Sequence, residues 1–576
     1  MIPIEIRLAE CSGNLEMMDK EIQRIDVAFA NLKEQRNNLL HLFRLPTELL
    51  TDILYRYLYR HLEDYLSPVS GALVLLLSVS RRIRTIILHC RKLWSLIDFR
   101  CDGVGAVKML GMAGSVPLVV RANLCGGDGH ETSWFPSPTP AWATRSDLWC
   151  STLENRPNIR ELHIRGSGWQ LVDLYAAMDK FQPDMTPLVS LRIACTTDDS
   201  PPLPESFAKF SAPELSEVKI HRVDLPLDSP LLGNALRHLE VLGQGRDQGP
   251  LSVILDGLRN LPNLQTLILR NYLPTSSPQE MESIKGVHHS RLRFLKLTDD
   301  VVSCAQLLRL MEVNYPTRVD LTCYADLSQE SILYPFLTSI SQNGVSGWIR
   351  TLSLVSGNSG TIQEIRAWPV HPPPGSDTVE DRTMGDPLLS VRFDHPHPFS
   401  DYDDGEAGGL PSKMRLDKLS TLSISGRLNY TWSDAVWRKA FQQSTDLTRL
   451  VVSDMIFDGF IEALSAGVDG EDHIMMKKLV CIALYGMYAS DESYSCKLRS
   501  MLVDRRSYGA PLQELRLVRC SGFEESDRCI LEELVPKLHW EVSRWPATPP
   551  WSGGDGGRTP RWSASARTPN PYIDND

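Results

Sequence analysis

Apolar residues between positions 15 and 39 alternate gaps of three and four along the chain. This spacing predicts an amphipathic helix with a heptad seam about 25 residues long. Such a helix can pair with a second copy of itself, giving a homodimer through residues 15–39, or fold back on the neighbouring segment, and the sequence leaves both open. The seam consists of Leu15, Met18, Ile22, Ile25, Phe29, Leu32 and Leu39, with Arg36 in its one polar slot.

A second helical pattern begins near residue 46. Pro46 suits the first helical turn, where its missing N–H needs no partner, and Glu48 in the same turn complements the positive end of the helix dipole. The apolar face that follows is wider than one contact within the chain requires, so part of it is expected to await a partner. This face comprises Leu49, Leu50, Ile53, Leu54, Tyr57 and Leu58.

Two further apolar segments follow this helix, Leu76-Leu77-Ser78-Val79-Ser80-Arg81-Arg82 and Leu93-Trp94-Ser95-Leu96-Ile97. In this order the three segments resemble the F-box, in the form common among fungal F-box proteins, over residues 45–99. The resemblance implies a three-helix unit that docks on a Skp-type adaptor, and through it on a cullin-RING ubiquitin ligase. An ordinary buried helical hairpin is the alternative. The adaptor-binding residues implied by the resemblance are Leu45, Pro46, Leu49, Leu50, Ile53, Leu54, Leu76, Val79 and Trp94.

The adaptor interface is expected to depend on a few central apolar side chains, because binding energy concentrates in such anchors. Leu49 and Leu50 are the predicted anchors, since they lie centrally in the motif. A Leu49→Asp, Leu50→Asp double variant is therefore expected to lose adaptor binding. Deletion of residues 45–99 is expected to do the same while residues 151–543 still bind their target.

A short template, Leu-x-x-Leu-x-apolar, recurs through the rest of the chain. Its central positions 239, 267 and 295 are 28 residues apart, as are 422 and 450, and this period lies in the leucine-rich-repeat range. Related variants begin at Ile159, Leu215, Ile349, Leu388 and Leu479. The matches to the template begin at Leu188, Leu236, Leu264, Leu292, Leu419, Leu447 and Leu512.

The template has a physical rationale, because alternating apolar residues on a short strand face the interior while the intervening residues face the opposite side. Each unit buries its leucines only against its neighbours, so a stack is needed. Segments such as residues 301–311 have helical character and would cover the convex side. The pattern resembles the leucine-rich-repeat half of F-box proteins; a non-repeat α/β domain is the alternative. Predicted concave positions are Arg237, Gln265, Arg293, Lys296, Arg449 and Arg516.

These patterns predict an α/β protein in several parts. An amphipathic or coiled-coil helix within residues 1–44 precedes an F-box-like domain at 45–100 and a connecting region at 101–150, with a strand expected at 116–121. A leucine-rich-repeat solenoid follows at 151–543, with parallel strands on its concave face and helices on its convex face. Prolines and like charges predict a solvated insertion near 369–412, and Gly, Ser, Thr, Pro and Arg predict a disordered tail at 544–576.

The amino-acid composition argues against several classes of function. A net charge of -11 argues against a general nucleic-acid binder or a binder of anionic membranes, which need clustered Lys and Arg. The 12 cysteines include no CxxC pair and no zinc-ligand spacing. The longest apolar run, residues 72–77, is far too short to span a bilayer, and no secretory signal is recognised. A cytoplasmic or nuclear location, or both, is expected.

Motifs for catalysis are missing from the sequence, including a P-loop, Gly-x-Ser-x-Gly and His-Glu-x-x-His. With the resemblance, this favours a non-catalytic substrate-recognition subunit of a Skp-cullin-F-box ubiquitin ligase, without cofactor or metal. Its F-box would bind the adaptor, and its repeats would bind an unknown protein target. The alternative is a leucine-rich-repeat scaffold with no ligase connection.

Overall fold

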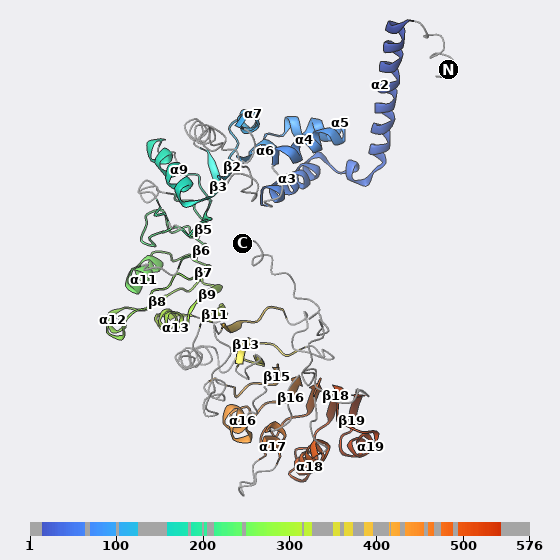
Figure 1. Ribbon diagram of the computed structural model, residues 1–576, viewed down its shortest axis with the longest axis vertical. Coiled ribbons are helices and arrows are strands. Elements are labelled where there is room, and N and C mark those ends of the chain that lie inside the picture. The colour runs from blue at the N-terminus through green and yellow to red at the C-terminus, as the bar shows by residue number, and fades with distance from the viewer. Residues whose placement is uncertain are drawn as a thin grey trace, which may run out of the picture. The chain divides into compact units, whose positions relative to one another are not determined.

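The computed structural model divides the chain into two compact units, one of residues 1–346 and 387–396 and the other of residues 347–386 and 397–576 (Figure 1). Each unit is described by itself. The described residues are 14–63, 69–99, 103–124, 158–181, 186–198, 201–203, 212–244, 249–313, 316–324, 349–356, 362–372, 385–394, 414, 416–426, 433–453, 459–465, 474–487 and 493–542. The predicted disordered tail at 544–576 and most of the predicted insertion at 369–412 lie outside them.

The first unit begins with helix α2, Leu15–Leu39, which has the bounds expected from the heptad pattern. The Asn14 side chain caps it by accepting a hydrogen bond from the Met17 amide at 3.3 Å. A short 3-10 helix, η1 (His41–Arg44), then turns the chain into the next helices. Of the predicted seam, Ile25 is partly covered and the other apolar residues are exposed to solvent.

Four helices form a compact group after η1: α3 (Thr47–Glu63), α4 (Val69–Val79), α5 (Arg81–His89) and α6 (Arg91–Trp94). Helix α3 begins directly after Pro46, as the missing amide of that residue predicts. The apolar sides of the helices meet in a common core, and each fully buried leucine stabilises it by about 1.5–3 kcal/mol. The core includes Leu50, Leu54, Leu58, Leu62, Leu73, Ile83, Ile87 and Leu93.

The boundary between these helices and the sheet differs from the prediction. Strand β1, Leu96–Asp98, ends the predicted F-box region, yet it pairs in parallel with β2, Leu118–Asn123. Helix α7, Gly103–Ala113, lies between the two strands in sequence. The region 101–150 was expected only to connect two domains, with a strand at 116–121. Its described part instead supplies a helix and a full sheet strand, because Leu118, Val119 and Val120 are buried.

The sheet of the first unit continues in parallel from β2 through successive strands. Their central apolar residues stand in register, so that Leu162 pairs with Leu191, Leu239 with Leu267, and Leu267 with Leu295. The predicted spacing of 28 residues is therefore the spacing of the neighbouring strands that carry Leu239, Leu267 and Leu295. The strands are β3 (Ile159–Gly166), β4 (Ser190–Cys195), β5 (Glu217–His221), β6 (His238–Leu242), β7 (Thr266–Arg270), β9 (Phe294–Asp300) and β11 (Arg318–Tyr324).

Helices cover one side of this sheet (Figure 1). They pack closely: a Cβ added at Gly257 of α11 would lie 2.6 Å from the backbone oxygen of Leu227, so only glycine fits there. The Asp300 side chain caps α13 by accepting from two amides. These helices are α9 (Gly168–Phe181), α11 (Leu251–Arg259), α12 (Pro278–Ser283) and α13 (Val301–Leu310), and a small parallel pair joins β8 (Val287–His288) to β10 (Met311–Glu312).

Strand β14, Leu389–Asp394, completes the sheet of the first unit by pairing in parallel with β11. It lies inside residues 369–412, where a solvated insertion was predicted. Leu389, Val391 and Phe393 alternate as buried residues, which explains why this stretch forms a strand between proline-rich segments. The variant of the template that begins at Leu388 is thus a true repeat strand.

The second unit contains another run of parallel strands, with one exception. Strand β13, Ile362–Trp368, pairs antiparallel with β12, Thr351–Ser356, whereas every strand was expected to be parallel. Strand β12 pairs on its other side with β15, so Leu352 lies opposite Leu422. The parallel run is β15 (Thr421–Ser425), β16 (Arg449–Ser453), β17 (Cys481–Tyr485), β18 (Glu514–Cys520) and β19 (Lys537–Val542).

The helices of the second unit alternate with these strands in sequence. Trp437 and Phe441 of α16 and Phe460 of α17 form a buried aromatic cluster with ring centroids 5.6 and 5.9 Å apart. The buried Arg505 of α18 donates to the backbone oxygens of residues 475 and 476. The helices are α16 (Asp434–Phe441), α17 (Phe460–Leu464), α18 (Ser493–Ser507) and α19 (Glu525–Leu534).

Candidate protein-binding surfaces

Helix α3 has one apolar side in the core and another in solvent. Leu50 is fully buried, whereas the preceding Leu49 is 54% exposed. Ile53 and Tyr57 follow Leu49 at intervals of four residues, so the three side chains lie along one stripe of the helix, and all are exposed. The structure therefore provides an uncovered apolar stripe, which we call the α3 stripe, formed by Leu49, Ile53 and Tyr57.

Two of the predicted adaptor-binding residues, Leu50 and Leu54, are not exposed in this structure. Leu50 and Leu54 were expected on a face exposed to a partner, but both are buried among the helices of this unit. A period of 3.6 residues turns the pair by about 100° around α3 from the pair of Leu49 and Ile53, toward the other helices. Their adaptor-binding role stays a prediction, but in this conformation their side chains pack within the chain.

The other predicted adaptor residues surround the start of α3. Arg82 of α5 donates to the backbone oxygens of Phe43 and, at 2.7 Å, of Leu45, so the end of α4 and the start of α5 lie beside the segment that leads into α3. Val79, at the end of α4, is exposed. Of the rest, Pro46 is exposed and Leu45 and Leu76 are half-buried.

Trp94 lies in α6, and its position is explained by a hydrogen bond. The indole Nε1 donates to the backbone oxygen of Ile87 at 2.6 Å, which ties α6 to α5 and leaves the ring half-buried. Trp94 therefore contributes to packing between helices as well as to the surface. The predicted adaptor residues thus divide between surface positions and packing positions.

Sequence reasoning missed two of the most exposed apolar residues of this region. Val74 and Leu75 of α4 are both exposed, Leu75 by 67%. The signal was available: residues 72–77 are all apolar, and a helix that buries one side cannot cover such a run. The exposed apolar surface therefore extends over α4 as well as α3.

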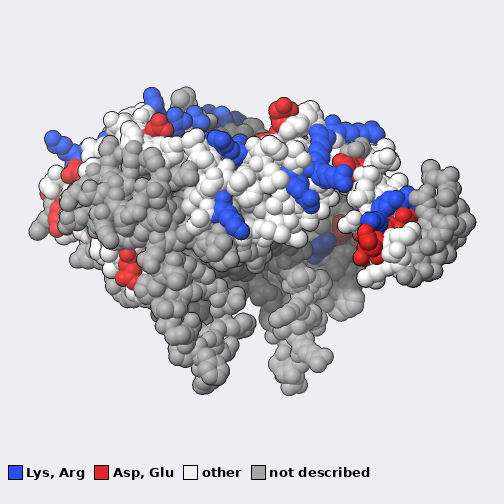
Figure 2. All heavy atoms as spheres, turned by 90° about the horizontal axis from the view of Figure 1, so that it is seen from above, with Lys and Arg blue, Asp and Glu red and all other residues white. Residues whose placement is uncertain are grey.

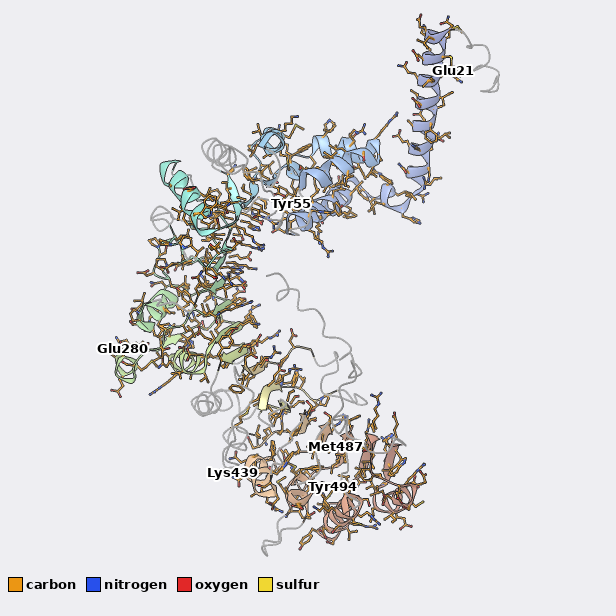
Figure 3. The ribbon with its side chains drawn as sticks, viewed as in Figure 1. Glu21, Tyr55, Glu280, Lys439, Met487 and Tyr494 are labelled. Atoms are coloured by element: carbon orange, nitrogen blue, oxygen red, sulfur yellow. The ribbon has the colours of Figure 1, made fainter. Side chains whose placement is uncertain are left out.

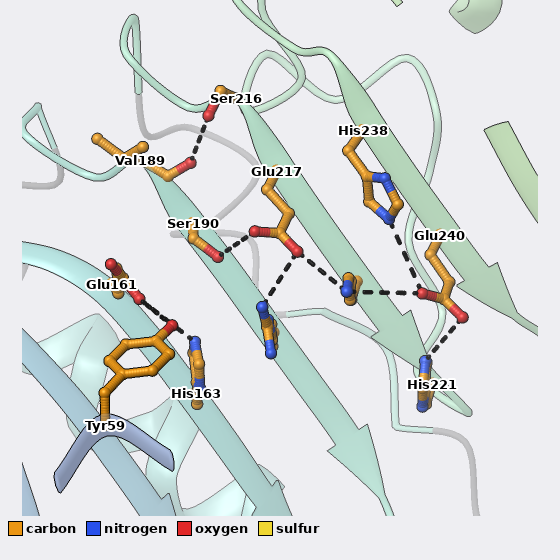
Figure 4. A network of polar contacts seen from close by, with 12 residues as sticks. Tyr59, Glu161, His163, Val189, Ser190, Ser216, Glu217, His221, His238 and Glu240 are labelled. Atoms are coloured by element: carbon orange, nitrogen blue, oxygen red, sulfur yellow. Dashed lines mark hydrogen bonds and ion pairs between the residues drawn. The ribbon is translucent and has the colours of Figure 1, made fainter. Parts of the chain in front are cut away.

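The side of the first sheet opposite its helices carries polar side chains. In-register residues of neighbouring strands form a row in which His163 stands next to Arg192, Arg192 next to Lys219, and Lys219 next to Glu240. Figure 4 shows Glu217 between Ser190 and the neighbouring basic groups, and Glu240 close to His221 and His238. We call this side the polar sheet face.

Carboxylates on the polar sheet face are held by cations from two strands. Glu217 accepts from Arg192 at 3.2 Å and from Lys219 at 3.0 Å. Burial raises the pKa of Glu217, but Arg192 and Lys219 lower it more, so the net pKa lies below its ordinary value. These contacts join β4 and β5 by their side chains.

Glu240 is the most strongly paired carboxylate of this face. Arg270 of the next strand donates to it at 3.2 Å, and the Nε2 atoms of His221 and His238 lie 3.8 and 3.9 Å from its oxygens. Burial raises the pKa of Glu240, yet the two imidazoles and the Arg270 guanidinium outweigh it and keep the carboxyl ionised. The side chain links β5, β6 and β7.

His163 differs from the other histidines of the polar sheet face. Burial, with Arg192 and Arg121 nearby, lowers its pKa to about 3, so the imidazole is neutral at pH 7. The 4.0 Å approach of its Nε2 to Glu161 is therefore no ion pair at that pH. Glu161 instead accepts a hydrogen bond from the hydroxyl of Tyr59 in α3 at 2.9 Å, which joins the helices to the sheet (Figure 4).

The predicted concave residues Arg237 and Gln265 lie at the amino ends of strands and not on the polar sheet face. With Glu214, Asn263 and Arg291 they line an open hollow of about 430 Å³. Lys296 does lie on the face, where it pairs with Asp320 at 3.1 Å. On the surface seen in Figure 2, basic and acidic side chains are both present among uncharged residues.

Within the described residues, no helix is long and apolar enough to cross a membrane. The same part of the chain contains no cluster of three or more His, Cys, Asp or Glu side chains that could hold a metal ion.

Comparison with known proteins adds little. No protein-family model matches the sequence, and no curated protein matches it. Among solved structures, the chain is similar to the crystal structure of the yeast Rad7 and Elc1 complex, at 12% sequence identity and a TM-score of 0.21. The match covers 54% of this chain and 73% of that chain. At this TM-score the likeness supports no conclusion about function.

The described residues define a mixed α/β protein. A group of helices at its amino end is joined to a long run of parallel strands covered by helices on one side.

Proposed function

We propose that this chain is the non-catalytic substrate-recognition subunit of a Skp-cullin-F-box ubiquitin ligase, acting in the cytoplasm, the nucleus or both. On this proposal, helices α3 to α6 are the F-box, and the parallel strands with their helices are irregular leucine-rich repeats. The F-box binds a Skp-type adaptor, which connects to a cullin-RING ligase. The repeats bind a target protein.

The observation that carries the proposal is the α3 stripe. Leu49, Ile53 and Tyr57 are exposed on a helix whose other side is buried, so their exposure is not a consequence of a loosely packed helix. Val79, Val74 and Leu75 add exposed apolar area on α4. Apolar surface of this extent on a small helical unit marks a site of protein contact.

The mechanism would be proximity and not bond chemistry. The helices would fix the chain on the ligase while the repeats hold a target near the charged ubiquitin-conjugating enzyme, which raises the effective concentration of target lysines. Tyr59 and Glu161 support this arrangement, because their hydrogen bond fixes α3 against strand β3. The target would thus be held at a defined place relative to the adaptor.

The test is a titration of the purified full-length protein with a Skp-type adaptor, measured by calorimetry. The variant is Leu49→Asp with Ile53→Asp, because Leu50→Asp would place a charge in the core and unfold the helices. We expect this variant to keep its circular dichroism spectrum and to bind at least a hundredfold more weakly, as loss of two central anchors implies.

A matched control places the same charges elsewhere. Val172 of α9 and Val253 of α11 are exposed to a similar degree, so Val172→Asp with Val253→Asp should bind the adaptor like the wild type. Equal affinities of the two double variants would contradict the assignment of the α3 stripe. Failure of the wild type to bind would remove the ligase proposal and leave a scaffold protein.

A further inference from the structure

The seam of α2 is an exposed apolar surface that the adaptor proposal does not use. Leu15 is 80% exposed, and Ile22, Phe29 and Leu32 are all exposed along the same line of the helix. Side chains project outward along this helix, Glu21 among them (Figure 3). Most of the stability of a protein helix comes from packing of its apolar side, so a helix with this pattern is completed by a partner.

The contact of α2 with the neighbouring helices uses the side opposite the seam. With Leu15 at heptad position a, Glu34 falls at f and Ala30 and Asn37 at b. These three residues are half-buried, and Arg81 of α5 lies 3.2 Å from the Glu34 carboxylate. This contact leaves the seam at positions a and d exposed, apart from Ile25, which is partly covered.

The charges along α2 point to a second copy as the occupant. Residues 15–26 contain four carboxylates and two cations, whereas residues 27–39 contain one carboxylate and two cations. Two copies side by side in opposite directions place the acidic half of one against the basic half of the other. The same arrangement also sets their helix dipoles in opposite directions, which is favourable.

Individual positions select the same orientation. In a parallel pair, Arg36 at position a would face Arg36 of the second copy, and Glu21 at g would meet Asp26 at e on both sides. In an antiparallel pair aligned over the full helix, Arg36 lies opposite Met18 of the second copy. Asp19 of each copy then lies beside Lys33 of the other, all at position e, which gives two attractive contacts. The one like-charge contact of this arrangement is between the two Asp26 residues.

We propose that α2 forms an antiparallel two-helix coiled coil with α2 of a second copy of this chain. The inference goes beyond the proposed ligase function and is independent of it. It uses residues outside the α3 stripe. Such a dimer presents two sheet faces, so a target with two binding segments would be held with higher avidity.

The first test is the molar mass of the full-length protein by light scattering after gel filtration. The wild type should have the mass of a dimer, and Ile22→Glu with Phe29→Glu should have that of a monomer. Both positions are exposed, so the helix does not depend on them within one chain. A monomeric wild type over the whole concentration range, or a trimer, would overturn the proposal.

Val27 supplies the matched control. It is exposed and apolar like Ile22 and Phe29, but it occupies position f, opposite the seam. Val27→Glu should therefore remain a dimer. Conversion of this variant to a monomer would show that loss of apolar surface anywhere on α2 is sufficient, and the seam assignment would be wrong.

Charge exchange tests the orientation. Asp19→Lys and Lys33→Glu should each weaken the dimer about tenfold at low salt, since two attractive contacts become repulsive in each. The double variant, which restores opposite charges only across an antiparallel pair, should return within about twofold of the wild type. Unchanged dimers for both single variants would overturn the antiparallel arrangement, since in a parallel pair Asp19 faces Asn14 and Lys33 faces Ala28.

Discussion

The helical region and the polar sheet face of the first unit both carry side chains that are not in the apolar core, but of opposite kinds. Along α2, α3 and α4 they include stripes of exposed apolar residues. On the sheet they are charged and paired across strands, as Glu217 is with Arg192 and Glu240 with Arg270. The helical region leaves apolar side chains uncovered, whereas charged side chains of the sheet contact charges of opposite sign on neighbouring strands.

This difference shows for which of the two surfaces a binding role can be inferred from the structure. An exposed apolar stripe has no favourable partner in water, so its presence argues directly for a contact. The charges of the polar sheet face contact one another across strands, and the shape and charges of the face do not by themselves specify a ligand. The helices therefore support a specific proposal, whereas the target of the sheet stays unidentified.

The largest effect should separate two adjacent residues of α3. Leu50→Asp places a carboxylate in the helical core and should lower the free energy of unfolding by about 4 kcal/mol or more. Leu49→Asp should change it by only about 0.5 kcal/mol, because Leu49 is exposed and an acid is favoured in the first turn. Chemical denaturation followed by circular dichroism measures both. Similar losses would mean that the α3 stripe is not free.

A pH effect should distinguish the sheet from the helices. His163 has its pKa lowered to about 3 in the folded state, against about 6.5 when unfolded. Below pH 6.5 the unfolded chain binds a proton at this imidazole that the folded chain does not bind. The free energy of unfolding should therefore decrease as the pH is lowered from 6.5 to about 3, by up to about 1.4 kcal/mol per pH unit.

The check is the pH dependence of the free energy of unfolding in the wild type and in His163→Gln. The variant cannot take up this proton, so its curve should be flatter between pH 6.5 and 3. At pH 7, where the imidazole is neutral, the two proteins should differ much less. Parallel curves over the acid range would show that His163 does not titrate as its burial implies.

The smallest effects compare one ion pair from each region. Glu240→Gln should lower the free energy of unfolding by about 1 kcal/mol, because Glu240 is largely covered and contacts Arg270 and two histidines. Asp52→Asn, which breaks the exposed pair with Arg56 on α3, should cost less than about 0.5 kcal/mol. Thermal unfolding of both variants measures which substitution destabilises the protein more. A larger loss for Asp52→Asn than for Glu240→Gln would contradict the contrast between the sheet and the helices.

Periodic features of the fold could be predicted from the sequence. The bounds of α2 and the register of Leu239, Leu267 and Leu295 follow from spacing, because a repeated local structure imposes a repeated sequence. The apolar run at residues 72–77 also contained a signal for the exposure of Val74 and Leu75 that was not used. The sequence was thus a reliable guide to where helices and strands lie along the chain.

Non-local features could not be predicted. Nothing in residues 96–98 shows that they pair with residues 119–121, and nothing in residues 362–368 sets them antiparallel to β12, because strand pairing depends on contacts distant in sequence. Which part of α3 is buried depended equally on the other helices, so Leu49 and Leu50 were grouped although one is exposed and the other is buried. For the same reason, deletion of residues 45–99 would remove β1 from the sheet and is not a clean test of adaptor binding.

Strand β1 is continuous with the helices and also belongs to the sheet, and Tyr59 bonds across to Glu161. The two parts therefore have no free hinge at this junction. Successive strands of a sheet are spaced by about 4.8 Å. On the proposed function, the strands of the first unit would set the distance between a bound target and the ligase. A target bound one strand further along would present its lysines about one strand spacing further from the ligase. The strand that binds the target would therefore determine which lysine is modified.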